Sequence, residues 1–126
     1  MTLTHNSTLT HQIIGLAIRV HTCLGPGLLE NVYEHCLCYE FDRANLRYER
    51  QVNLPLIYDG ISFDCCYRAD VIVNREVLLE IKSVEHVLPL HEAQLLTYLR
   101  LSPCRVGLLL NFNAMALKDG IKRRVL

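Results

Sequence analysis

The sequence predicts an α/β fold in which helices pack against a mixed β-sheet. Apolar residues recur at helical spacing through the first third of the chain, and from Val52 onward they alternate with a period of two. A further helical segment then precedes an apolar run rich in Leu and Val at residues 105–112. The expected order is therefore two helices, three strands, a helix and one or two strands.

The first two helices are expected where apolar residues recur every three or four positions. The first covers residues 13–24, after a polar tail over residues 1–10, and Gly25-Pro26-Gly27 interrupts its pattern. The second runs from about residue 28 to residue 44, and Asn45 suits its C-terminal end.

Strands replace helices in the middle of the chain. Pro55 implies that the first strand lies at a sheet edge, because proline cannot donate a ladder hydrogen bond. Asp59-Gly60 is typical of a two-residue hairpin turn. The strand after it alternates, so that its apolar residues share one face. These residues are Ile61, Phe63, Cys65, Tyr67, Ala69, Val71 and Val73.

The last third of the chain predicts a helix and two strands. Pro89 suits the first position of a helix that reaches Leu101, and Ser102-Pro103 ends it. A buried strand follows at residues 105–112, and a short strand is expected at residues 121–126. Because we find no repeat and no linker, we expect one domain that spans residues 1–126.

Composition fits one soluble globular domain with a single core. The chain has 126 residues, of which 51% are hydrophobic and 21% charged. Its apolar runs are far shorter than the roughly 20 residues of a membrane span, so we expect a cytoplasmic protein with no membrane partner. The formal net charge is zero, so that nucleic-acid binding would need a local basic patch. The candidate patches are Arg43, Arg47 and Arg50, and Lys118, Lys122, Arg123 and Arg124.

The six cysteines predict reduced thiols more than disulfides or zinc. They lie in apolar, periodic segments of a chain long enough to bury a core without covalent links. A structural zinc site would need closely and regularly paired ligands, and the sequence contains no CxxC pattern.

Three charges stand out in the apolar stretch ADVIVNREVLLEIKSVE, which starts at Ala69. If residues 74–76 turn the chain into a strand over residues 77–82, matched apolar faces require Val71 to lie opposite Leu79 and Ala69 opposite Ile81. Asp70 then lies opposite Glu80, and like charges about 5 Å apart destabilise a sheet.

Either of two arrangements accounts for these charges. One is a solvated sheet face on which Arg68 and Lys82 neutralise the two carboxylates by diagonal pairing. The second is a cation site, because carboxylates that converge from rigid strands are ligands for a hard ion such as Mg²⁺. Lys82, on the same face as Glu80, could then activate water or stabilise charge on a phosphate.

These residues resemble a known family. Asp70 followed by Glu80-Ile81-Lys82 is similar to the PD-(D/E)xK motif of the restriction-endonuclease-like nucleases, whose α-β-β-β-α-β core matches the expected order apart from an extra N-terminal helix. Gly27 to Tyr33 fits the pattern of the GxxExxY proteins, a group within that superfamily, and Gln94 to Tyr98 fits a QxxxY element. The likeness runs from Ile13 to the C-terminus; Asn113, where many relatives have glycine, departs from it.

The resemblance implies a Mg²⁺- or Mn²⁺-dependent nuclease that hydrolyses DNA or RNA with metal-activated water. Its metal ligands would be Asp70, Glu80 and the backbone carbonyl of Ile81, with Glu30 reaching the cation directly or through water. Lys82 would serve the attacking water, and Gln94 would orient that lysine or a phosphate oxygen. The partner would be nucleic acid, with DNA favoured, and a homodimer or a larger nucleic-acid-processing complex stays open.

Several of these residues also fit ordinary structural roles. A carboxylate in the first turn of a helix, such as Glu30, is favoured by the helix dipole whatever its chemistry. Tyr33 fits a core position. Tyr98, one turn after Gln94, and His91 on the same side of the helix are candidate substrate contacts, yet such residues are ordinary on a helix surface. The whole chain could also be a non-catalytic binding module on the same fold, or a scaffold without a metal.

Overall fold

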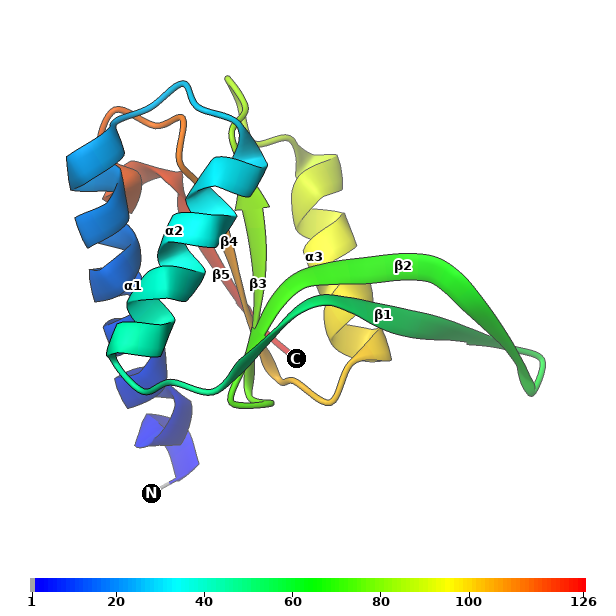
Figure 1. Ribbon diagram of the computed structural model, residues 1–126. Coiled ribbons are helices and arrows are strands. Elements are labelled where there is room, and N and C mark those ends of the chain that lie inside the picture. The colour runs from blue at the N-terminus through cyan, green and yellow to red at the C-terminus, as the bar shows by residue number, and fades with distance from the viewer. Residues whose placement is uncertain (1) are drawn as a thin grey trace.

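The computed structural model describes residues 2–126, with side chains described for residues 8–64 and 67–126. Its element order confirms the expected α/β class and the expected sequence of helices and strands (Figure 1). The helices are α1 (Thr2–Leu24), α2 (Glu30–Arg43) and α3 (Pro89–Leu101), with a short 3-10 helix, η1 (Leu117–Gly120). The strands are β1 (Tyr48–Tyr58), β2 (Ile61–Val73), β3 (Val77–Lys82), β4 (Val106–Asn111) and β5 (Ile121–Val125).

Two boundaries differ by more than two residues from those expected. Residues 2–10, expected as a polar tail, are the first turns of α1, because no Gly or Pro before Gly15 interrupts a helix that propagates from its packed C-terminal half. β1 begins at Tyr48 and not at Val52, so it is longer than the alternating pattern indicated.

The strands form one mixed sheet in the order β1-β2-β3-β4-β5. All neighbours are antiparallel except β3 and β4, which are parallel and are connected through α3. β1 is the edge strand that Pro55 predicted, and its register with β2 shifts at that proline. Asp59 and Gly60 have φ values of 53° and 73°, which confirms the two-residue hairpin turn between β1 and β2.

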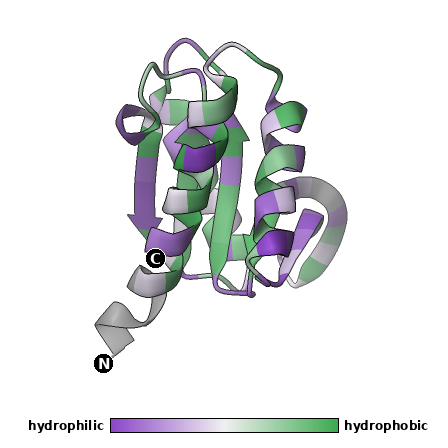
Figure 2. Ribbon diagram, turned by 60° about the vertical axis from the view of Figure 1, so that its left-hand side comes forward, coloured by the Kyte–Doolittle hydropathy of each residue, from purple (hydrophilic) through white to green (hydrophobic). Residues whose placement is uncertain are grey.

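Helices cover both faces of the sheet. α1 and α2 lie on one face and α3 lies on the other (Figure 1). Each face has its own apolar cluster, and β3 and β4 contribute to both. Figure 2 shows these central strands mostly hydrophobic between the helices, whereas β5 at the edge is mostly hydrophilic. The two central strands therefore fix the core, and the site described below lies at the end of β3.

The β1–β2 hairpin joins both clusters and then leaves the body of the molecule. Val71 and Val73 pack in the cluster under α1 and α2, whereas Ala69 and Tyr67 pack against α3. The apolar residues of β2 that were expected to share one face therefore pack in two different clusters, one on each side of the sheet. The reason is that the hairpin crosses from β3 toward α3 (Figure 1). We call residues 52–69 of this hairpin the arm.

Asn111, the last residue of β4, fastens the loop that follows β3. Its Oδ1 accepts hydrogen bonds from the backbone N–H of Val84 at 3.0 Å and of Asn113 at 3.2 Å, and its Nδ2 donates to the carbonyl of Val84 at 3.0 Å. Gly120 packs directly against the backbone oxygen of Asn111, where a Cβ atom would clash. The lack of a side chain at Gly120 therefore allows the end of η1 to pack against the end of β4.

We predict that Gly120→Ala lowers the free energy of unfolding by about 1–3 kcal/mol, because the added methyl group overpacks a site that cannot move freely. Gly15→Ala is the matched control: a methyl group on this exposed glycine of α1 would meet no atom within 4 Å, and alanine is the better helix former by up to about 1 kcal/mol. Urea unfolding measures both. A Gly120→Ala variant with an unchanged free energy of unfolding would contradict the close packing.

A candidate active site where two strands diverge

β2 and β3 separate at Asp70 and Glu80. Their ladder contains Val73 opposite Val77 and Val71 opposite Leu79, which confirms the register expected from the three-residue turn. The next step would pair Asp70 with Glu80, but the ladder stops there. The expected pairing of Ala69 with Ile81 is therefore wrong, and Ala69 keeps only its partner on the other edge of β2, Val52 of β1.

The two carboxylates replace the missing ladder hydrogen bonds. The backbone N–H of Ile81 donates to Asp70 Oδ2 at 2.8 Å, and the backbone N–H of Asp70 donates to Glu80 Oε2 at 3.1 Å. Each strand thus satisfies a backbone donor of the other with a side chain, and buried donors need such partners. Within the described part of the chain, the second oxygen of each carboxylate accepts no hydrogen bond, so each has an oxygen left for a ligand.

Burial makes these carboxylates weak acids. Glu80 is 5% exposed, and its desolvation, followed by the charge of Asp70, raises its pKa to about 8. Desolvation raises the pKa of Asp70 to about 6 against the opposing hydrogen bond from the Ile81 N–H. The expectation of a solvated face is thus wrong for Glu80, and Arg68, which is exposed, makes no ion pair with either acid among the described residues. A cation here would offset the repulsion between two buried charges.

Lys82 lies at the same end of β3. Its charge lowers the pKa of both Asp70 and Glu80, so its ammonium group lies within electrostatic range of both. The backbone carbonyl of Lys82 accepts a hydrogen bond from the N–H of Phe112 at 2.9 Å, which holds the end of β3 against the end of β4. The structure therefore brings together the three charges singled out in the sequence.

Glu30 approaches from the first turn of α2. Its Oε2 accepts a hydrogen bond from the backbone N–H of Ser83 at 3.1 Å, and Ser83 Oγ donates to the carbonyl of Leu28 at 2.6 Å. These bonds dock the start of α2 on the residue after Lys82. The charge of Glu30 raises the pKa of both Asp70 and Glu80, yet no three His, Cys, Asp or Glu side chains of the described residues are grouped to hold a metal ion.

One residue of α3, Tyr98, lies near the same site. Burial and then the charges of Glu80 and Asp70 raise the pKa of Tyr98, whose ring packs edge-on against Tyr67 with the ring centroids 5.7 Å apart. Gln94, one helical turn earlier, is half-buried. His91 has a structural partner, because its Nδ1 accepts a hydrogen bond from the backbone N–H of Leu88 at 3.0 Å at the start of α3.

Glu34 is a buried acid that the sequence analysis missed. It lies one turn after Glu30 on α2, is 5% exposed, and its charge raises the pKa of Asp70. Arg50 Nε and Nη2 each lie 2.9 Å from Glu34 Oε2, and Gln51 Nε2 donates to both carboxylate oxygens at 3.0 Å. Gln51 has φ of 51° and drops out of the β1–β2 register opposite Asp70. The four-residue spacing from Glu30 was the available signal.

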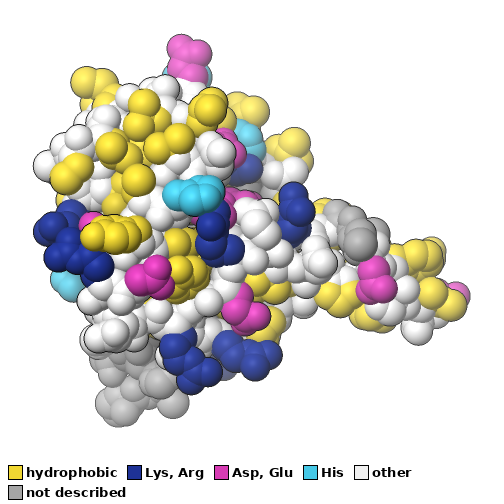
Figure 3. Space-filling model, viewed as in Figure 1, with side chains coloured by type: hydrophobic (Ala, Val, Ile, Leu, Met, Phe, Trp, Pro, Cys, Tyr) yellow, Lys and Arg dark blue, Asp and Glu magenta, His cyan; other side chains and the backbone are white. Residues whose placement is uncertain are grey.

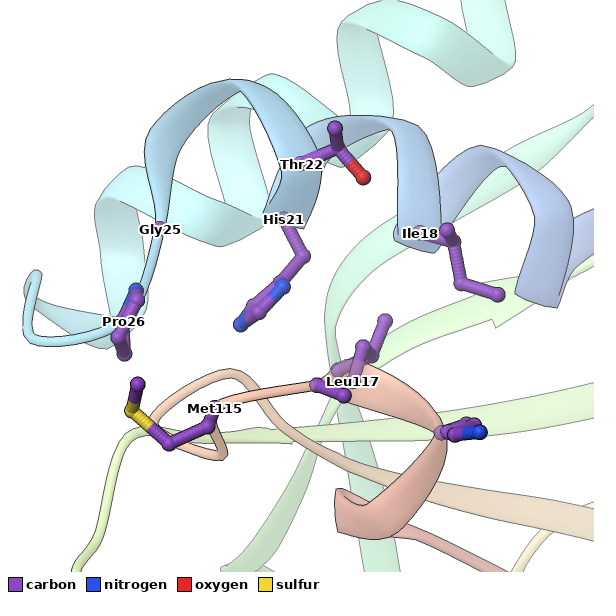
Figure 4. A pocket seen from close by; sticks show the side chains of 9 residues that line it. Ile18, His21, Thr22, Gly25, Pro26, Met115 and Leu117 are labelled. Atoms are coloured by element: carbon purple, nitrogen blue, oxygen red, sulfur yellow. The ribbon is translucent and has the colours of Figure 1, made fainter.

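The cavity in Figure 4 is separate from these acids. It has a volume of about 430 Å³ and lies between the end of α1 and the segment before β5, lined by Pro26, Met115 and Leu117 among others. His21 points into this space and its Nε2 lies 2.8 Å from the carbonyl oxygen of Ala114. The contact with Ala114 gives His21 a structural partner, and the candidate active site lies elsewhere, at the strand divergence.

The fold and the paired acids define an α/β protein with a candidate cation site at the end of its central strand. A family model described as the PD-(D/E)XK nuclease superfamily matches residues 7–124. The chain belongs to this superfamily, whose members act in general on nucleic acids and typically use divalent metals. No curated protein and no solved structure matches the chain. Among the described residues, no helix has the length and apolar character needed to cross a membrane.

We predict that the metal-free protein loses stability as the pH rises from about 5 to about 8.5. The folded pKa of Glu80, about 8, exceeds its ordinary value of 4.5, so the folded chain holds a proton that the unfolded chain has released. This stabilisation is complete below the ordinary pKa and is lost as the pH rises through the folded pKa.

The measurement is urea unfolding in EDTA at about pH 6 and about pH 8.5. The loss attributed to Glu80 is on the order of 2 kcal/mol and should be missing in Glu80→Gln. Glu85→Gln, which changes an exposed carboxylate five residues away, should retain it. If wild type and Glu80→Gln lose the same unfolding free energy between these two pH values, the assignment to Glu80 is wrong.

Proposed function

We propose that the chain is a Mg²⁺- or Mn²⁺-dependent nuclease that hydrolyses phosphodiester bonds of DNA or RNA. One observation carries the proposal. In a chain of a nuclease superfamily, the Asp70 carboxylate accepts the backbone N–H of Ile81 and the Glu80 carboxylate accepts that of Asp70 where two strands part, at the strand end that carries Lys82. The two carboxylates are ligands for a hard cation, and the lysine amine can stabilise charge on the phosphate that reacts.

Within the superfamily, we propose that the chain is a GxxExxY protein. The pattern covers Gly27 to Tyr33, and its residues have linked roles. Tyr33 is buried, its hydroxyl donates to the carbonyl of Gly25 at 2.5 Å, and it accepts from the N–H of Leu28 at 3.0 Å. The hydrogen bonds of Tyr33 thus hold the loop before α2, at whose start Glu30 accepts the N–H of Ser83. This link between two residues of the pattern supports the assignment to the GxxExxY proteins.

The donor set fits a divalent cation. One carboxylate oxygen each of Asp70 and Glu80 and the carbonyl of Ile81 are hard oxygen donors, and Mg²⁺ commonly combines one or two carboxylates with water and substrate phosphate. Glu30 would join through water or after leaving Ser83. A bound cation would lower the pKa of water and polarise the scissile phosphate.

The remaining side chains then have defined tasks. The Lys82 ammonium, within electrostatic range of both acids, would orient the attacking water or stabilise negative charge on a phosphate oxygen. Gln94 would orient Lys82 or a phosphate oxygen, and Tyr98 and His91 would contact the substrate. Arg50 and Gln51 would hold Glu34 in place beside Asp70.

A second candidate is a non-catalytic nucleic-acid-binding or complex-supporting module. The zero net charge counts against a free-standing nuclease, which needs phosphate contacts to retain its substrate, and so favours the complex-supporting form of this module. The complete acid and lysine set favours the nuclease, because a binding module has no need to bury two repelling carboxylates.

We predict cleavage of linear, circular or single-stranded nucleic acid in the presence of Mg²⁺ or Mn²⁺ and none in EDTA. Asp70→Asn and Lys82→Ala should each reduce the rate at least a hundredfold, because they remove a cation ligand and the amine. Arg105→Ala, which changes an exposed arginine at the end of the sheet opposite Lys82, is the matched control and should retain the wild-type rate. Cleavage that survives Lys82→Ala unchanged would indicate a contaminating nuclease.

We also predict that Mn²⁺ affinity rises with pH between about 6 and 8.5. Metal ligands must lose their protons, and the pKa of Glu80 lies within this range. Calorimetric titration with Mn²⁺ measures the affinity, and Glu80→Gln should lower it at least tenfold while Glu85→Gln leaves it unchanged. No binding at either pH would favour a scaffold without a metal; binding without cleavage would favour the binding module.

A further inference from the structure

The arm carries an apolar face that this chain does not cover. β1 is an edge strand, and β2 has lost β3 as a neighbour beyond Val71, so the arm is a two-stranded ribbon with both edges open. Figures 1 and 3 show it projecting well past α3. A two-stranded ribbon is only marginally stable in water unless one face packs on something.

The uncovered face is composed of cross-strand pairs. Tyr58 pairs with Ile61 and Leu56 with Phe63, and alternation puts these four side chains on the same side of the ribbon. Tyr58 is 70% exposed, Ile61 56% and Phe63 45%, and Figure 3 shows hydrophobic side chains at the tip. We call these four residues the arm face.

The arm face continues a core surface. Two residues before Leu56 on β1, Leu54 is buried in the cluster against α3, together with Ala69 of β2. The apolar surface that packs on α3 near the body thus extends past the helix to the tip. The opposite side of the tip is different, because Ile57 there pairs with the polar Ser62.

We propose that the arm face is a dimer interface, at which a second copy of this chain packs its own arm face about a two-fold axis. A two-fold contact uses the same patch on both partners, and an apolar patch is complementary to itself. The formal net charge of zero means that two copies do not repel each other.

The size of the face and the edge chemistry both support this contact. With Tyr58, Ile61 and Phe63 70%, 56% and 45% exposed, each arm face offers roughly 400 Å² to a partner, so two arm faces bury about 800 Å², the size of a weak, reversible contact. Pro55 lacks an N–H and interrupts the outer edge of β1, which disfavours edge-to-edge strand pairing. Pairing along β1 is thus disfavoured relative to packing through the arm face, for which we expect a dissociation constant on the order of tens of micromolar. This inference does not depend on the nuclease proposal.

The test is sedimentation equilibrium of the full chain from about 1 to about 200 µM, a range that brackets the expected affinity. Wild type should shift from monomer to dimer. The double variant Tyr58→Lys/Phe63→Lys, and separately Ile61→Lys, should weaken the dimer at least tenfold. Ile57→Lys is the matched control, because Ile57 is 60% exposed on the other side of the same tip, and should change the affinity less than threefold.

Circular dichroism and thermal unfolding should remain native in every variant, since all of these side chains are exposed at the tip. A wild-type protein that stays monomeric at about 200 µM overturns the proposal, as does an Ile57→Lys variant that dissociates as readily as Ile61→Lys. Loss of nucleic-acid binding in the face variants of a monomeric protein would assign the arm to the substrate instead.

Discussion

The structure depends on one exchange of hydrogen bonds. Where β2 and β3 would next pair, the Asp70 and Glu80 carboxylates accept the backbone N–H groups of Ile81 and Asp70. The exchange ends the ladder without leaving a buried donor unpaired. It thereby allows the hairpin to leave β3 for α3, and it places half-buried Asp70 of β2 beside buried Glu80 of β3.

A half-buried and a buried carboxyl group side by side are costly to ionise, and the surrounding residues reflect that cost. Desolvation raises the pKa of both acids, whereas Lys82 lowers them from the same strand end. On α2, Glu34 is neutralised by Arg50, and Glu30 is held by the Ser83 backbone. A protein that needed only a stable sheet would be better served by apolar residues at these positions. The arrangement therefore suits a site that is completed by a cation and a phosphate.

The sequence alone predicted the fold and the central acids because their signals are local. Periodicity located the helices and strands, Asp59-Gly60 marked the hairpin, and matched faces set the β2–β3 register. The divergence at Asp70 was not predictable, since it results from side chains that displace backbone partners. Glu34 was missed for a similar reason: its role depends on Gln51, whose left-handed backbone turns it toward α2.

The central claim is that Asp70 and Glu80 share a divalent cation, and anomalous diffraction from crystals soaked in Mn²⁺ tests it most directly. The account predicts a manganese peak between these two carboxylates, within about 2.0–2.4 Å of an oxygen of each. A fully loaded crystal whose only peaks lie elsewhere, with the Ile81 and Asp70 N–H bonds intact, would contradict it.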